Sequence, residues 1–173
     1  RVASFAWNQH RHLEAYCGVP GIGAVLHMVN IRLSPEHLIY IINHAENKAL
    51  LFDEDLLPLV EKIAEHLKTV KTYIIMSDQD ELPDSTLSPL YSYEKLLADG
   101  DPSFQFKKDF DENTPAGMCF TSATTGNPKG VVYTHRALFL HSLALGLVDT
   151  LSLSEKDISM PVVPMFHVNA WGM

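Results

Sequence analysis

The chain has 173 residues, of which 46% are apolar, and it carries a formal net charge of −8 at pH 7. A chain of this length can bury a sizeable core and matches the usual size of one domain. No stretch gathers Lys and Arg, so the composition argues against a nucleic-acid-binding protein. An anionic ligand can still bind locally, because a few backbone N–H groups and one lysine suffice to hold it.

The two ends of the chain and its cysteines indicate whether the chain is an excerpt and in which compartment it occurs. It begins with Arg1 and stops directly after an apolar motif at Met173, which predicts an excerpt of a longer protein. No apolar run is long enough to span a bilayer, and the residues given contain no signal peptide. Cys17 and Cys119 lie far apart in apolar surroundings. This predicts buried free thiols in a cytoplasmic protein and leaves peripheral contact with a membrane open.

Strands and helices are predicted to alternate along the first part of the chain. Short apolar runs that predict strands occupy residues 2–7, 24–29, 49–52 and 70–76. Helices are predicted between them at residues 12–19, from residue 34 onward, and at residues 56–67. This alternation predicts an α/β fold with a largely parallel sheet flanked by helices.

The first two predicted helices carry different signals at their ends. Ser34-Pro35-Glu36 is a typical start, with a serine N-cap, a proline at the first helical position and an acid in the first turn. The helix before it is predicted to stop at Pro20-Gly21. Arg11, between two histidines, could bind an anion, although a loop that enters a helix is the favoured interpretation.

Residues 77–115 differ in composition from both flanks. They are polar and contain Asp, Ser, Pro and Gly throughout, with one short helix predicted near residues 93–98. We therefore predict a connector here, between a first α/β sub-region at residues 1–76 and a second sub-region at residues 116–173.

The second sub-region holds the segment that points most directly to chemistry. Between two predicted strands stand four hydroxyl side chains, two glycines, one proline and one lysine, in the order Thr121-Ser122-Ala123-Thr124-Thr125-Gly126-Asn127-Pro128-Lys129-Gly130. Small and hydroxyl side chains leave backbone N–H groups open to a ligand, and Lys129 adds a positive charge, a combination that suits a polyphosphate. A P-loop hydrolase or a kinase is disfavoured, because Lys129 is not followed by Ser or Thr and no Gly-rich kinase loop occurs. On these residues alone, a hydroxyl-rich hairpin turn is an equally good interpretation.

Two apolar segments follow this loop. After a short strand at residues 131–133, residues 136–148 predict a helix that is apolar nearly all round and therefore buried. The last stretch, residues 161–172, is also apolar and contains His167 and Trp171.

Three stretches resemble the adenylate-forming superfamily, whose members include acyl-CoA synthetases, luciferases and peptide-synthetase adenylation domains. The run TSATTGNPKGVVYTH at residues 121–135 resembles the AMP-binding signature of that superfamily. The run PVVPMFHVNAWG at residues 161–172 looks like its next conserved block, at a fitting distance from the first. Residues 6–53 are similar to the fatty acid–CoA ligase branch, including relatives that act on short methylthio acids.

The resemblance implies that the chain is part of the large N-terminal domain of an enzyme that forms acyl-adenylates. Such an enzyme would use ATP and Mg²⁺ to activate a fatty acid of medium or long chain. The carboxylate attacks the α-phosphorus, pyrophosphate leaves, and the thiol of CoA then displaces AMP. A ligase for a short acid such as methylthio-propionate is one alternative, and a non-catalytic nucleotide-binding domain is another. The resemblance also makes a homodimer possible.

The same resemblance assigns roles to single residues. Lys129 and His167 would be catalytic, with His167 beside the reacting carboxylate, and Thr121 would lie near the Mg²⁺ that bridges the phosphates. Ala123 stands where the family usually has glycine, which would stiffen the loop or weaken nucleotide binding. The residues expected to bind the nucleotide or the acyl group are Thr121, Ser122, Ala123, Thr124, Thr125, Gly126, Lys129, Val168 and Trp171.

Overall fold

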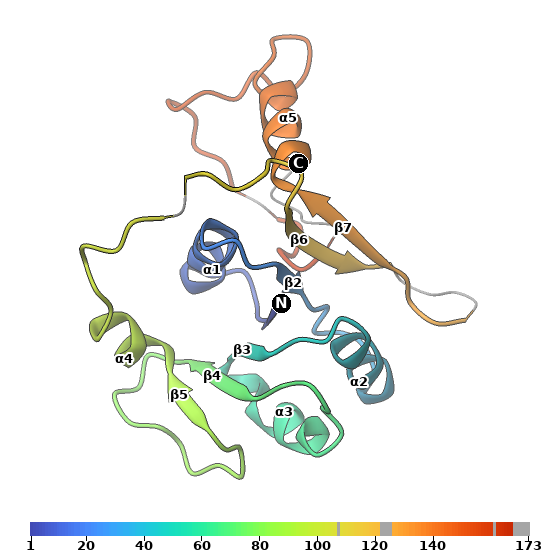
Figure 1. Cartoon of the computed structure of the whole chain (residues 1–173), viewed down its shortest axis with the longest axis vertical. Coiled ribbons are helices and arrows are strands. Elements are labelled where there is room, and N and C mark those ends of the chain that lie inside the picture. Colours follow the sequence, from blue (N-terminus) through green and yellow to red (C-terminus); the bar gives the residue numbers. More distant parts are fainter. Residues whose placement is uncertain (107, 122–125, 161, 168–173) are drawn as a thin grey trace.

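The computed structural model describes residues 1–106, 108–121, 126–160 and 162–167. Within these residues, seven strands form one sheet in the order β5-β4-β3-β1-β2-β6-β7 (Figure 1). Neighbouring strands run parallel, except that β6 and β7 are antiparallel. The predicted α/β fold with a largely parallel sheet is therefore confirmed. The strands are β1 (Val2–Phe5), β2 (Leu26–Met28), β3 (Ala49–Asp53), β4 (Thr72–Met76), β5 (Leu90–Ser92), β6 (Pro115–Phe120) and β7 (Gly130–Thr134).

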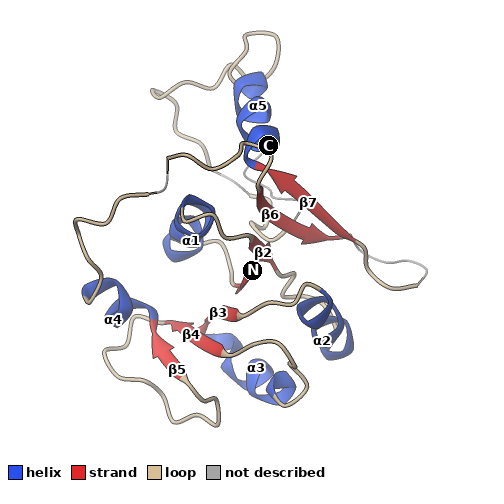
Figure 2. Ribbon diagram, viewed as in Figure 1, coloured by secondary structure: helices blue, strands red, loops and turns tan. Residues whose placement is uncertain are grey.

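Helices cover both faces of this sheet, as Figure 2 shows for α1 on one side and α2 and α3 on the other. The connection from β1 to β2 and the connection from β2 to β3 run in opposite directions, so right-handed crossovers place their helices on opposite faces. No helix of the described residues is both long and apolar enough to cross a membrane. The helices are α1 (His10–Gly21), α2 (Pro35–His44), α3 (Leu57–Ala64), α4 (Tyr93–Ala98) and α5 (His135–Leu145), with a short 3-10 helix, η1 (Glu54–Leu56), ahead of α3.

The core forms where the middle strands meet the helices. Leu50, Leu51 and Phe52 of β3 alternate between the two faces of the sheet, yet all three are buried. This pattern is expected for a parallel strand that is covered by helices on both sides. The largest fully buried apolar side chains are Phe5, Leu26, Leu38, Ile41, Ile42, Leu50, Phe52, Ile63, Ile75 and Met165.

Serine caps begin two of the helices where the sequence predicts them. The hydroxyl of Ser34 accepts a hydrogen bond of 3.4 Å from the backbone N–H of His37, at the start of α2. Ser92 accepts one of 3.4 Å from the backbone N–H of Lys95, at the start of α4. Both helix starts are thus confirmed. α1 is longer than predicted, because it begins at His10 and its last turn includes Pro20 and Gly21.

β5 lies in the segment whose composition predicts a connector. Its three residues pair in parallel with β4, from Tyr73 opposite Leu90 to Ile75 opposite Ser92. Three residues are too few to show a period-two pattern, so polar neighbours hide this edge strand in the sequence. The sheet consequently draws strands from both predicted sub-regions and from the predicted connector.

Two predictions of burial are wrong. α5 is present but exposed, with Phe139 65% and Leu143 54% accessible. Figure 1 shows α5 standing beyond β7, apart from α1, α2 and α3, so the described elements leave its apolar sides uncovered. Cys17 is exposed and Cys119 buried, and both thiols are free. The buried residues of α1 include Ala15, and Cys17 falls on another side of that helix.

Candidate functional site

The strand order puts a change of winding direction at the centre of the sheet. β1 lies between β2 and β3, so the chain winds first toward β2 and then the opposite way through β3, β4 and β5, before β6 returns to the side of β2. Open α/β sheets bind ligands beyond the carboxyl ends of their strands, next to such a change of direction. Two of the depressions at this edge lie beside the central strands. The first lies at the ends of β2 and β6, and the second at the ends of β1, β3 and β4.

The first depression has a volume of about 270 Å³ and a mainly apolar lining. Its apolar side chains come from β2, the loop before α2, α2 itself, β6 and the segment at residues 163–167. Three polar side chains, those of Asn30, Thr121 and His167, complete it. Such a site suits a ligand with an apolar body and one polar or charged end. The full lining is Met28, Asn30, Leu33, Ile41, Phe120, Thr121, Phe166 and His167.

The hydroxyl-rich loop connects two antiparallel strands and is closed at its base. The backbone N–H of Thr121 donates to the carbonyl oxygen of Lys129 at 3.0 Å, and the backbone N–H of Lys129 donates to the Thr121 hydroxyl oxygen at 3.4 Å. Gly126 has φ +89°, a left-handed conformation that side-chain-bearing residues adopt at a cost. Lys129 is exposed, so its ammonium group is accessible to a ligand.

The fold brings together two residues from separate sequence motifs. Thr121 and His167 both line the first depression. Thr121 belongs to the stretch at residues 121–135 and His167 to the stretch at residues 161–172, both of which resemble the adenylate-forming superfamily. Lys129 lies across the loop base, next to Thr121, outside the lining of that depression. Ser122, Ala123, Thr124, Thr125, Val168 and Trp171 lie outside the described residues.

The segment at residues 163–167 is held by side chains from the start of the chain. The Asn8 side-chain amide donates to the carbonyl oxygen of Val163 at 3.1 Å and accepts from the backbone N–H of Met165 at 2.7 Å. The Tyr16 hydroxyl donates to the carbonyl oxygen of Met165 at 2.6 Å. Asn8 and Tyr16 are not among the predicted site residues, because partners 149 to 157 positions apart leave no local signal in a single sequence.

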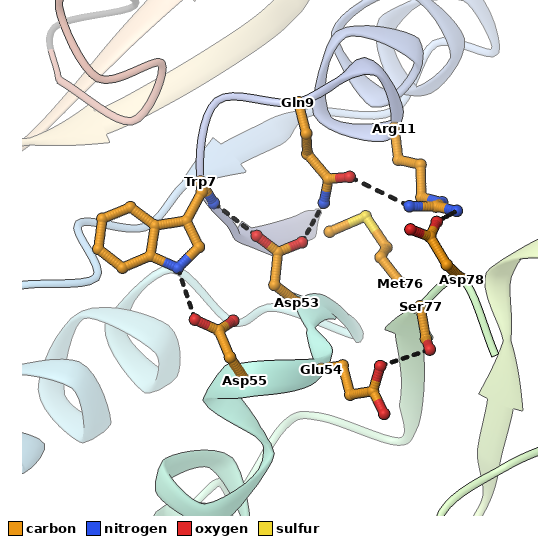
Figure 3. Close-up of a pocket in the computed structure, with 9 residues that line it drawn as sticks. All are labelled: Trp7, Gln9, Arg11, Asp53, Glu54, Asp55, Met76, Ser77 and Asp78. Carbon is orange, nitrogen blue, oxygen red and sulfur yellow. Dashed lines mark hydrogen bonds and ion pairs between the residues drawn. The ribbon is translucent and has the colours of Figure 1, made fainter.

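The second depression is polar, and Figure 3 shows the side chains that line it. It has a volume of about 490 Å³. The Asp53 carboxylate accepts from the backbone N–H of Trp7 at 2.7 Å and from the Gln9 side-chain amide, while the Trp7 indole N–H donates to Asp55 at 2.9 Å. The lining residues are Trp7, Gln9, Arg11, Asp53, Glu54, Asp55, Met76, Ser77 and Asp78.

Burial changes the acid–base properties of two groups around this second depression. The pKa of Asp53 is raised to about 6, chiefly because its carboxyl group is desolvated, and the Trp7 N–H offsets only part of that effect. The pKa of His12 is lowered by burial; its ring contacts the Trp7 carbonyl and the Ser4 hydroxyl at 3.0 Å each. We therefore expect His12 to be neutral at pH 7.

The charge of Arg11 is already neutralised within the protein. Its guanidinium group donates to Asp78 at 2.6 Å and to Glu94 at 2.5 Å, and its side chain is 9% exposed. Glu94 belongs to α4, so this pair of contacts ties α4 to α1. The structure therefore favours a loop entering a helix over an anion site at this position.

A family model described as AMP-binding enzyme matches residues 1–173. The chain belongs to the AMP-binding enzyme family. It is 55% identical over 172 residues to a long-chain-fatty-acid–CoA ligase from Thermus thermophilus, with 99% of this chain and 30% of the relative covered. A 3-methylmercaptopropionyl-CoA ligase from Ruegeria pomeroyi is 52% identical over 172 residues, covering 99% of this chain and 32% of the relative. A medium-chain-fatty-acid–CoA ligase from Ectopseudomonas oleovorans is 46% identical, with 99% and 31% covered.

Solved structures support the same fold. The anthranilate CoA ligase AuaEII in complex with anthranoyl-AMP superposes with a TM-score of 0.85 at 21% identity, over 95% of this chain and 30% of that one. A long-chain-fatty-acid–CoA ligase from Archaeoglobus fulgidus gives a TM-score of 0.83 at 24% identity, over 99% and 32%. The α/β architecture is therefore shared with these two CoA ligases. The chain spans about a third of the length of the relatives it matches.

Proposed function

We propose that this chain works within an ATP-dependent acid–CoA ligase that activates a fatty acid as its acyl-adenylate and then transfers the acyl group to CoA. Family membership and 46% to 55% identity to three acid–CoA ligases support the proposal. The observation that carries it is that Thr121 and His167, from two separate motifs, line one mainly apolar depression.

The hydroxyl-rich loop is proposed to hold the β- and γ-phosphates of ATP. Lys129 would donate to phosphate oxygens and offset their charge, and its exposed position beside Thr121 suits this role. Gly126 and the hydroxyl-bearing residues Ser122, Thr124 and Thr125 would complete the contact. Donors that are fixed in advance need little reorganisation as charge moves toward the departing pyrophosphate.

Thr121 is proposed as one protein ligand of the Mg²⁺ that accompanies ATP. Its hydroxyl is a hard oxygen donor of the kind that Mg²⁺ prefers, and an oxygen that accepts from the Lys129 N–H keeps a second lone pair. Among the described residues, no group of three or more His, Cys, Asp and Glu side chains could hold a metal ion. Mg²⁺ commonly binds through substrate phosphates and few protein ligands, of which Thr121 is the candidate among the described residues. When bound, Mg²⁺ would neutralise charge on the phosphates.

His167 is proposed to orient the carboxylate of the acid, with its acyl chain in the apolar part of the first depression. Val168 and Trp171, which follow in the same motif, would line the adjoining nucleotide and acyl pocket. Holding the carboxylate near the α-phosphorus removes the entropy cost of bringing two reactants together. We propose an acid of medium or long chain, since Met28, Leu33 and their apolar neighbours offer an apolar chain a matching surface.

The test is pyrophosphate release by the full-length protein that contains this chain. Octanoate, palmitate and 3-methylmercaptopropionate are each supplied with ATP, Mg²⁺ and CoA. Release that requires both ATP and an acid is expected, and the preferred acid separates a fatty acid ligase from a ligase for the short methylthio acid. Formation of ADP and phosphate would indicate a kinase or an ATPase, and ATP binding without turnover would indicate a non-catalytic domain.

The setting of the enzyme is also a proposal. We infer a cytoplasmic enzyme with small-molecule substrates, assembled as a homodimer, in which residues 1–76, 77–115 and 116–173 act as two sub-regions and their connector. Light scattering on the full-length protein would give twice the monomer mass if the homodimer is correct.

A further inference from the structure

We propose that Asn8 is a positioning residue, which fixes the segment at residues 163–167 and thereby the location of His167 beside Thr121. The inference about His167 chemistry rests on the proposed function, whereas the inference about its position rests on contacts alone. Asn8 lies in the loop between β1 and α1, at the boundary between the two depressions.

Asn8 contacts backbone in two places with one side chain. Its amide nitrogen donates to the Val163 carbonyl at 3.1 Å, and its amide oxygen accepts from the Met165 N–H at 2.7 Å. A carboxamide that uses both its donor and its acceptor in this way fixes both the distance and the direction of the backbone it contacts. Because only backbone atoms of the segment take part, the contact does not depend on the side chains at positions 163 and 165.

Met165 is held at three points. Its N–H is bonded to Asn8, its carbonyl oxygen accepts from the Tyr16 hydroxyl at 2.6 Å, and its side chain is 1% exposed. Two residues further on, the backbone N–H of His167 donates to the Pro164 carbonyl at 2.9 Å, which closes a turn around Met165. The backbone of His167 is thus tied to Pro164, which lies between the two residues, Val163 and Met165, that side chains of α1 and the loop before it contact.

The residues on either side of Asn8 are themselves fixed. Trp7 and Gln9 both donate to the Asp53 carboxylate at the end of β3, as Figure 3 shows. The Trp7 carbonyl also contacts the buried ring of His12 on α1 at 3.0 Å. A side chain mounted on a loop that is bonded to both a strand and a helix is pre-organised, which is the support that positioned groups need.

A second asparagine in the same chain offers a matched control. Asn43 on α2 donates to the His66 carbonyl at 2.9 Å and accepts from the Lys68 N–H at 2.8 Å, so it makes the same two-point contact with backbone. Asn43 lines neither depression. Asn43→Ala should therefore cost similar stability without touching the His167 segment.

The first measurement is amide hydrogen exchange of the full-length protein, with and without each substitution. Asn8→Ala should speed exchange at residues 163–167 by about tenfold, the effect of losing two hydrogen bonds, while Asn43→Ala should speed it only near residues 66–68. Asn8→Asp keeps the shape but loses the donor to Val163, and it covers the case in which Asn8→Ala does not fold. Unchanged exchange at residues 163–167 in the Asn8 variants would overturn the proposal.

The second measurement is acid-dependent pyrophosphate release by the same variants. Asn8→Ala should lower kcat by roughly tenfold or more with the KM for ATP within about twofold, because a misplaced His167 affects the acid rather than the phosphate loop. Asn43→Ala should keep wild-type kinetics. Equal kinetic effects of both substitutions would overturn the positioning role. If the wild-type protein releases no pyrophosphate, the proposed function fails, and the exchange comparison still decides the role of Asn8.

Discussion

The Asp53 carboxylate, at the end of β3, accepts a hydrogen bond of 2.7 Å from the backbone N–H of Trp7, in the loop after β1. This contact joins the carboxyl ends of two neighbouring strands at the centre of the sheet. Asp53 is only 7% exposed, and desolvation raises its pKa to about 6. A group that is hard to ionise in the folded state but easy to ionise in the unfolded state makes stability depend on pH.

Asp53 should cause the chain to lose stability as pH rises through its folded pKa. The pKa of Asp53 is ordinarily 3.8 and rises to about 6 in the folded state. Between these two pH values the folded state binds more protons than the unfolded state, so the contribution of Asp53 to the free energy of unfolding is largest at low pH. Asn at position 53 does not titrate. As pH rises from 4 to 7, the free energy of unfolding of Asp53→Asn should therefore increase relative to that of the wild type by up to about 3 kcal/mol.

The measurement is the free energy of unfolding in urea at several pH values for both chains. Carboxyl groups with a lowered pKa, such as those of Glu61 and Asp78, make stability rise with pH. They do so equally in the wild type and in the variant, so the difference in free energy of unfolding between the two proteins reports on Asp53. Parallel pH curves would contradict the raised pKa.

Gly126→Ala should destabilise the chain by about 1 to 2 kcal/mol, the cost of a left-handed backbone for a residue with a Cβ. Apart from Gly126 itself and its chain neighbours, no atom of the described residues lies within 4 Å of the added methyl group, so we expect the cost to be conformational rather than steric. Gly18→Ala is the matched control, because a methyl group at this position in α1 also meets open space. Alanine within a helix should raise stability there by roughly 0.5 to 1 kcal/mol. Urea denaturation of both variants checks the pair, and equal effects would show that φ at Gly126 is not what matters.

Lys129→Ala in the full-length protein should raise the KM for ATP by about tenfold and leave the KM for the acid nearly unchanged. A charge-assisted contact with phosphate is worth about 1.5 to 3 kcal/mol, which supports a change of this size. Lys71→Ala removes an exposed lysine just before the amino end of β4, on the opposite edge of the sheet, and should have no effect. Unchanged kinetics in Lys129→Ala would remove this lysine from the phosphate site.

Trp171→Ala should alter which acids the full-length protein prefers, if the indole borders the acyl pocket. The motivation is a large amphipathic ring four positions after His167 in the second motif. Trp7→Phe serves as the control, because Trp7 lines the second depression instead. Chain-length profiles measured with acids of increasing length would be the same in all three proteins if Trp171 merely fills the core.

Local signals in the sequence were sufficient for much of the fold. The serines at positions 34 and 92 cap helices that start where predicted, and the buried run at residues 49–52 becomes a central parallel strand. The edge strand Leu90–Ser92 could not be predicted, because it is short and takes its stability from pairing with β4. The predicted burial of α5 was wrong, because an apolar sequence does not reveal whether other elements of the described residues pack against the helix.

Some residues of the candidate site could also be predicted from the sequence, whereas others are apparent only in the tertiary fold. A short motif predicted Thr121, Gly126 and Lys129, and the structure closes the base of that loop as a hairpin. The contacts of Asn8 with residues 163 and 165 depend on the tertiary fold, so a single sequence contains no sign of them. Resemblance to a family supplied His167, and the fold then brought it to the same depression as Thr121.

The most direct test of the central claim is whether the full-length protein makes an acyl-adenylate. ATP labelled at the α-phosphate is incubated with Mg²⁺ and the preferred acid, without CoA, and the products are separated. The account predicts labelled acyl-AMP that is converted to AMP and acyl-CoA when CoA is added. The isolated 173-residue chain should form none, because the acid–CoA ligases it matches are about three times longer. Label found in ADP, or no acyl-AMP from the full-length protein with any acid, would contradict the account.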